Sequence, residues 1–124
     1  MAYVPLVVCR ENLDRYSWES RKLTLSLLKL MSRNLGLNSE TLAGAFENGR
    51  QGVKMNLYPA CAQADKVIGH SPHFDINGLT LILEVNDVQG LQFKKNGKWV
   101  PVKPVSAGTF IVNIGDAIEV NYYA

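Results

Sequence analysis

A chain of 124 residues, 47% of them hydrophobic and 19% charged, has the size and composition of one modest globular domain. Its net charge of +2 argues against a nucleic-acid binder. The clustered lysines Lys94, Lys95 and Lys98 flank an expected hairpin turn, where solvated charges are common, so they do not indicate a binding surface. No run approaches the roughly 18 apolar residues of a membrane span, and no basic region precedes the first apolar piece. We therefore expect neither a membrane partner nor a secretory signal. Cys9 and Cys61 predict free thiols in a reducing compartment, which favours a cytoplasmic protein.

The first part of the chain has the periodicity of helices. Between residues 11 and 35, apolar side chains recur at three- and four-residue steps and form one stripe, at Leu13, Tyr16, Leu23, Leu27, Leu30, Met31 and Leu35. Asn12 is expected to cap the start of this helix and Gly36 its end. A shorter helix with Asn38 or Ser39 as its cap is expected next, ending at the following Asn-Gly pair. The leucine-rich stripe is expected to lie against a sheet.

From Val53 onward, short runs of β-branched, aliphatic and aromatic residues alternate with turn residues, as is typical of strands. The run LTLILEV is apolar enough to be buried on both faces, and Asn96-Gly97 is the strongest hairpin signal in the chain. Helices followed by strands predict an α+β fold whose main body is a sandwich or jelly roll. A jelly roll has about eight strands, so the strands found here look like part of a domain. They are expected at residues 53–58, 79–85, 91–93, 99–100 and 109–114.

Both histidines of the chain lie in one short stretch, IGHSPHFD, in which His73 is followed two residues later by Asp75. In an extended strand these two side chains share one face, and Phe74 points to the opposite face, towards a core. Two histidines and one carboxylate form a site that suits non-haem Fe(II), because three coordination positions stay open. His73 and Asp75 would supply two of those three ligands. The pair alone is also compatible with an unrelated jelly-roll binding module.

The residues around this pair resemble the plant 2-oxoglutarate- and Fe(II)-dependent dioxygenases, the family of flavonol synthase, anthocyanidin synthase and the gibberellin oxidases. Four stretches occur in the order of that family: N-x-Y-P-x-C, S-P-H-x-D, V-x-G-L-Q-x-x-x-x-G-x-W-V-x-V and V-N-x-G-D-x-x-E. The resemblance implies helices followed by part of a double-stranded β-helix, or jelly-roll, core. It divides the chain into a helical segment, residues 1–50, and a partial dioxygenase domain, residues 51–124. Together the four stretches make the resemblance specific.

The resemblance also implies a role for individual residues. His73 and Asp75 become the first two iron ligands, and Asn56 and Tyr58 line the pocket of the co-substrate 2-oxoglutarate, where an amide and a phenol can bond to a dicarboxylate. His70 has no ligand role in the family pattern and is expected in a loop. Asp116 is expected to fix a turn through backbone hydrogen bonds. The implied partner is a small organic substrate, a plant metabolite.

The chain departs from the family pattern at the third metal ligand and at the co-substrate anchor. No histidine follows His73, and the Arg-x-Ser pair expected downstream is absent because the last arginine is Arg50. The family's helical and strand region before the leucine-rich helix is also missing. We therefore expect a truncated dioxygenase that binds iron weakly and has little or no activity. An alternative is a non-catalytic remnant that associates with a homologous chain through an open sheet edge.

Overall fold

The long first helix of the computed structural model, α1, spans Leu6–Asn34 and begins earlier than the sequence predicted. The expected cap Asn12 therefore lies inside the helix, because residues 6–11 contain no glycine or proline that would end it. The structure describes residues 6–86, 88–103, 106 and 108–123, so the last residue of the chain, Ala124, lies outside the described residues. Among the described residues, no helix is long and apolar enough to cross a membrane.

Gly36 ends α1 as predicted. Its φ of 72° is in the left-handed region, which favours glycine because a side chain there meets the backbone. The Gly36 N–H donates to the Arg33 carbonyl at 3.0 Å, and the Leu37 N–H donates to the Ser32 carbonyl at 2.9 Å. This pair of hydrogen bonds is the Schellman motif, which satisfies carbonyl groups that the end of a helix leaves without partners.

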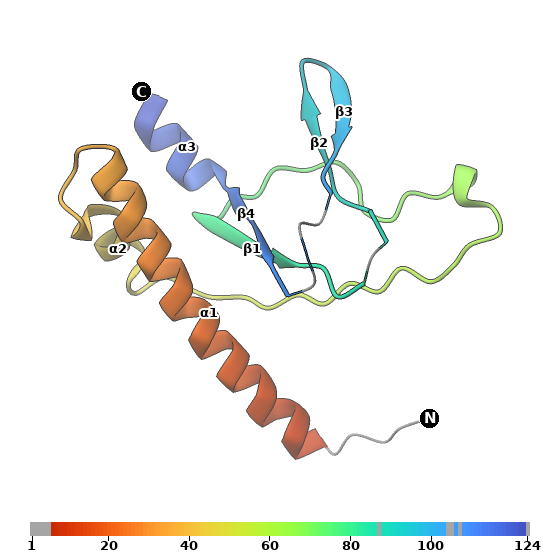
Figure 1. Ribbon diagram of the computed structural model, residues 1–124, viewed down its shortest axis with the longest axis horizontal. Coiled ribbons are helices and arrows are strands. Elements are labelled where there is room, and N and C mark those ends of the chain that lie inside the picture. The colour runs from red at the N-terminus through yellow and green to blue at the C-terminus, as the bar shows by residue number, and fades with distance from the viewer. Residues whose placement is uncertain (1–5, 87, 104–105, 107, 124) are drawn as a thin grey trace. The chain divides into compact units, whose positions relative to one another are not determined.

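A second helix, α2, spans Glu40–Phe46 and lies beside α1 (Figure 1). Ser39 has the N-cap position, but its side chain makes no capping hydrogen bond, whereas Asn38 Oδ1 accepts from the Glu40 N–H at 2.9 Å. Ser32 of α1 is fully buried, and its hydroxyl donates to the Leu28 carbonyl at 3.0 Å while accepting from the Leu42 N–H at 3.1 Å. One α1 side chain thus satisfies a donor in the first turn of α2, where the N–H groups have no partner within the helix.

The contacts within the chain divide it into two compact units, Met1–His73 and Phe74–Ala124, and each is described by itself. The expected boundary between residues 50 and 51 stays a prediction. In the first unit, residues 53–58 do not form the predicted strand, and the segment from there to His73 contains one short 3-10 turn, Ala64–Lys66. A strand needs a neighbour for its backbone hydrogen bonds, and no described strand pairs with this segment. Cys9 and Cys61 are free thiols, as predicted.

The second unit contains two pairs of antiparallel strands (Figure 1). Strand β1, Leu79–Leu83, pairs with β4, Phe110–Ile114, in a register that places Thr80 opposite Asn113. All five β1 residues are half-buried, so the expectation of burial on both faces was wrong; β4 is its single partner among the described strands. Strand β1 also ends two residues earlier than expected.

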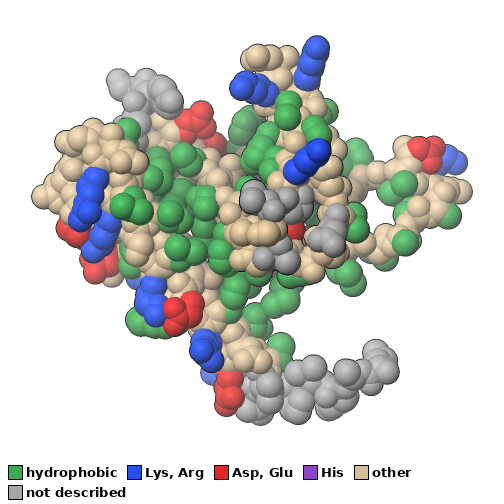
Figure 2. All heavy atoms as spheres, in the orientation of Figure 1, with side chains coloured by type: hydrophobic (Ala, Val, Ile, Leu, Met, Phe, Trp, Pro, Cys, Tyr) green, Lys and Arg blue, Asp and Glu red, His purple; other side chains and the backbone are tan. Residues whose placement is uncertain are grey.

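The predicted hairpin is present, with β2, Gln92–Lys95, paired to β3, Lys98–Pro101. Asn96 and Gly97 form its turn with positive φ angles of 51° and 77°, as a two-residue turn of type I′ requires. Lysine side chains gather at the tip of this hairpin (Figure 2), where Lys94 lies 5.9 Å from the centre of the Trp99 ring. Charges at an exposed turn are solvated, which agrees with the interpretation made from the sequence.

After β4 the chain passes through Gly115 directly into a short helix, α3, Asp116–Tyr123. The Gly115 carbonyl accepts hydrogen bonds from the N–H groups of Ile118 and Glu119, which form the first turn of α3. Ile118 is 4% exposed and is a buried apolar residue of this unit. Gly115 thus joins the end of β4 to the start of α3.

Candidate functional site

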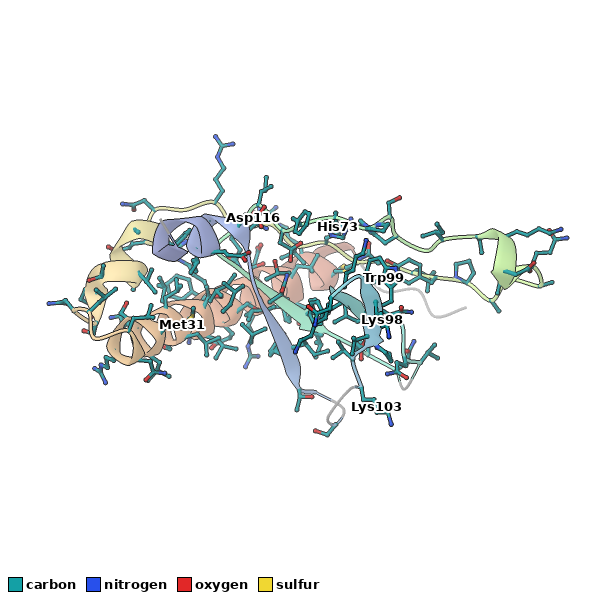
Figure 3. All side chains as sticks on the ribbon, turned by 90° about the horizontal axis from the view of Figure 1, so that it is seen from above. Met31, His73, Lys98, Trp99, Lys103 and Asp116 are labelled. Atoms are coloured by element: carbon teal, nitrogen blue, oxygen red, sulfur yellow. The ribbon has the colours of Figure 1, made fainter. Side chains whose placement is uncertain are left out.

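His73 and Asp75 lie on an extended segment, residues 71–76, that belongs to no strand. His73 is exposed on this segment (Figure 3), and Phe74 is 83% exposed. The expectation that Phe74 faces a core was wrong. No described strand pairs with this segment, so there is no sheet whose opposite face would bury Phe74. The division between the two compact units falls between His73 and Phe74, so His73 belongs to the first unit and Asp75 to the second.

The imidazole of His73 is oriented by the backbone of its own segment. His73 Nδ1 lies 2.9 Å from the Ser71 carbonyl oxygen. A carbonyl oxygen only accepts hydrogen bonds, so Nδ1 carries the hydrogen and Nε2 is the nitrogen with the lone pair. Histidines that bind metals commonly hold one ring N–H against a carbonyl in this way, which fixes the tautomer and the ring orientation.

His70 lies in a loop, as predicted, but it also contacts His73. The two rings are 4.3 Å apart between their centres and inclined by 40°, and His70 Nδ1 lies 3.0 Å from the same Ser71 carbonyl. On its other side, His70 Nε2 lies 2.9 Å from Lys54 Nζ. Since Nδ1 donates to the carbonyl, Nε2 accepts from the ammonium group. The sequence analysis missed Lys54, which is 16 residues away in the chain and belongs to no recognised motif.

The carboxylate of Asp75 is half-buried and is held by the end of β4. Asn113 Nδ2 donates to Asp75 Oδ2 at 2.5 Å. The backbone is held too, because the Asp116 N–H donates to the Asp75 carbonyl at 2.8 Å and the Gly115 N–H donates to the Gly78 carbonyl at 2.9 Å. Asp116 is the first residue of α3 (Figure 3), and its backbone bonds to a distant segment, so the prediction that it fixes a local turn was wrong.

Gly115 is required where the two segments cross. A Cβ atom on Gly115 would lie 2.0 Å from the Asn77 carbonyl oxygen and 2.7 Å from the Asp75 carbonyl oxygen. Both distances are far below van der Waals contact, so the hydrogen bonds of this crossing depend on glycine. Asn113 and Gly115 were noted in the sequence only as members of the V-N-x-G-D stretch, and the sequence analysis assigned neither of them a contact with Asp75.

The two residues predicted to line the co-substrate pocket are exposed and belong to the same unit as His73. The Tyr58 ring packs against Gly69, where an added Cβ would lie 3.0 Å from two of the ring carbons. Tyr58 therefore lies beside the segment that leads to His73, with 57% of its surface exposed. Asn56 is two residues earlier on the same exposed segment.

The donor atoms fit a divalent cation in kind but are too few to enclose one. An imidazole with Nδ1 protonated and a carboxylate are ligands that suit Fe(II), which also accepts co-substrates at open positions. Among the described residues, however, no group of three or more histidine, cysteine, aspartate or glutamate side chains could hold a metal ion. His73 and Asp75 therefore provide at most two protein ligands.

Comparison with known proteins identifies relatives that cover most of this chain. The model of the 2OG-Fe(II) oxygenase superfamily matches residues 49–122. The chain is 48% identical over 111 residues to 2-oxoglutarate-dependent dioxygenase 11 of Oryza sativa subsp. japonica and 48% identical over 113 residues to Protein SRG1 of Arabidopsis thaliana. Each alignment covers 90% of this chain and 31% of the relative, so the chain spans about a third of the length of these proteins.

A solved structure confirms the fold class. The crystal structure of JOX2 in complex with 2OG, Fe and JA matches 96% of this chain and 35% of that chain, with a TM-score of 0.79 and 35% sequence identity. The fold is therefore α+β, with helices followed by part of a jelly-roll core, as the sequence predicted. The matched part is about a third of the JOX2 chain.

Proposed function

Since this chain belongs to the 2OG-Fe(II) oxygenase superfamily, we propose that it carries two of the iron ligands and part of the 2-oxoglutarate pocket of an oxygenase. The substrate class is a small organic plant metabolite, as the relatives suggest. The observation that carries the proposal is the hydrogen bond that His73, two residues before Asp75, donates from Nδ1 to the Ser71 carbonyl. Because Nδ1 holds the hydrogen, Nε2 is the ring nitrogen that can bind a metal.

In this proposal, His73 would bind Fe(II) through its imidazole and Asp75 would bind it through its carboxylate. The phenol of Tyr58 and the amide of Asn56 bond to the 2-oxoglutarate carboxylates. When bound, iron and 2-oxoglutarate together activate dioxygen for oxidation of the organic substrate. The residues of this chain bind and orient these groups, and Asp75 keeps a negative charge beside the cation.

With two protein ligands in the described part, we expect weak metal binding and little or no oxygenase activity from the 124 residues alone. Mn(II), which prefers similar ligands, is a suitable probe because it broadens the NMR signals of nearby nuclei even when it binds weakly. We expect Mn(II) to broaden the signals of His73 and of the Asp75 backbone first. The variants His73→Ala and Asp75→Ala should each abolish this selective broadening, and Asn12→Ala on the exposed side of α1 is the matched control.

Selective broadening that persists in both His73→Ala and Asp75→Ala would refute the proposed metal site. For the co-substrate, 2-oxoglutarate added to the Mn(II)-loaded chain should tighten metal binding, and Tyr58→Phe should reduce that effect while leaving binding of Mn(II) alone unchanged. If 2-oxoglutarate tightened Mn(II) binding equally in the Tyr58→Phe chain, Tyr58 would not be part of the co-substrate pocket.

A second candidate function is association through a sheet edge. Strands β1 and β4 form a two-stranded sheet, so each of them has an edge that no other described strand covers. Such an edge can add a strand from another chain. If this function holds, the mass measured by light scattering should rise with protein concentration, and Val112→Lys on β4 should prevent the rise because an edge charge disfavours strand addition. A mass that stays that of a monomer would exclude it.

A further inference from the structure

The hydrogen bond between Asn113 and Asp75 joins two residues 38 positions apart, and the proposed function above does not require it. Asn113 lies in β4, opposite Thr80 of β1, so its backbone is held in a paired strand. Its side chain is half-buried, and its Nδ2 lies 2.5 Å from Asp75 Oδ2. A side chain on a paired strand has few alternative positions, which makes it a firm support for the carboxylate.

Two backbone hydrogen bonds also hold the segment that contains Asp75. The N–H groups of Asp116 and Gly115 donate to the carbonyls of Asp75 and Gly78 at 2.8 and 2.9 Å. Three contacts from residues 113–116 therefore converge on residues 75–78, and the close approach at Gly115 fixes their spacing. The position of the Asp75 backbone is set by these two backbone bonds, and the rotation of its carboxylate is set by Asn113.

We propose that Asn113 is a positioning residue for metal binding by Asp75, an inference that rests on the proposed function. A carboxylate can bind a cation through one oxygen or through both. The hydrogen bond from the amide occupies one lone pair of Oδ2 and restricts the rotation of the carboxylate, which favours binding of the cation through a single oxygen. An amide carries no charge and does not titrate, so this support leaves the negative charge of Asp75 available to the cation.

The test compares Mn(II) affinity in the full chain and in four variants. Asn113→Leu replaces the amide with an apolar group of similar size, and Asn113→Val does so with a residue that strongly favours strands. Thr80→Val is the matched control, because it changes the register partner of Asn113 and removes a hydroxyl that has no hydrogen-bond partner among the described residues. Asp75→Ala reports whether Asp75 binds the metal at all. Circular dichroism verifies that each variant is folded.

We expect both Asn113 variants to bind Mn(II) roughly 10- to 100-fold more weakly, as is typical when a partner of a metal ligand is removed. Thr80→Val should stay within about twofold of the original chain. A purely structural role would not change the mode of carboxylate binding, so the second readout is infrared difference spectroscopy on addition of Mn(II). The separation between the antisymmetric and symmetric carboxylate stretches should be wide in the original chain and narrower in the Asn113 variants, because a carboxylate that binds through both oxygens has the smaller separation.

The outcomes separate this inference from the proposed function. If Asp75→Ala weakens Mn(II) binding and both Asn113 variants bind as the original chain does, the role of Asn113 is refuted and the metal site stands. If Asp75→Ala binds Mn(II) as the original chain does, the metal site itself is refuted, and the inference falls with it. Loss of folded structure in both Asn113 variants would identify Asn113 as a residue of folding and would also overturn the inference.

Discussion

Replacement of Gly115 by alanine should strongly destabilise the second unit. The added Cβ would lie 2.0 Å from the Asn77 carbonyl oxygen and 2.7 Å from that of Asp75, where ordinary contacts are at 3.4 Å or more. Both obstacles are backbone atoms, so relief requires the two segments to separate by about 1 Å or more. Such a movement breaks the hydrogen bonds from Gly115 to Gly78 and from Asp116 to Asp75.

The magnitude follows from these losses. Two backbone hydrogen bonds contribute about 1 kcal/mol each, and forcing extra atoms into a packed site costs about 1–3 kcal/mol. We therefore expect Gly115→Ala to lower the free energy of unfolding by about 3–5 kcal/mol, a large share of the roughly 5–15 kcal/mol that stabilises a small domain. The assay is urea unfolding, combined with amide hydrogen exchange of β1 and β4, because the effect should be confined to the second unit.

Gly44→Ala is the control. Gly44 lies inside α2 and an added Cβ there meets nothing within 4 Å, so the same chemical change should stabilise the chain by about 0.5–1 kcal/mol. The reasoning would be refuted by a Gly115→Ala chain whose unfolding free energy lies within about 0.5 kcal/mol of the original, since ordinary surface substitutions produce changes of that size.

Three further substitutions test other parts of the structure. Ser32→Ala removes the acceptor for the Leu42 N–H, and leaving this buried donor unpaired should cost about 1–3 kcal/mol in urea unfolding; an unchanged stability would show that the hydroxyl bridge is not formed in solution. Thr80→Val removes a buried hydroxyl without a described partner and should raise stability by about 1 kcal/mol in the same assay, so a decrease would show that the hydroxyl has a partner. Gly97→Ala places a side chain at a φ of 77° in the hairpin turn and should cost about 1 kcal/mol, measured as faster amide exchange in β2 and β3; unchanged exchange would contradict the turn assignment.

The parts of the fold that the sequence determined are local. The apolar stripe predicted α1, and Gly36 and Asn96-Gly97 predicted a helix end and a hairpin turn that the structure contains. Each of these features depends on the conformational preferences of a few consecutive residues, which the sequence states directly. The His-x-Asp pair was recognised in the same way, by its spacing and its neighbours, and its role as a metal site stays a prediction.

The tertiary structure alone decided which extended segments found partners and which side chains surround Asp75. Residues 53–58 have the composition of a strand, but no described strand pairs with them, and a strand depends on such a neighbour. Phe74 lies between two polar residues, as a core residue of a strand would, but it is exposed because its segment belongs to no sheet. Asn113 and Gly115 meet residues 75–78 across a gap of almost 40 positions, and no local pattern states which residues will meet after such a gap. Local conformational preferences depend on each residue and its neighbours in the chain. Contacts between distant residues form only when the chain has folded and the strands have taken their register.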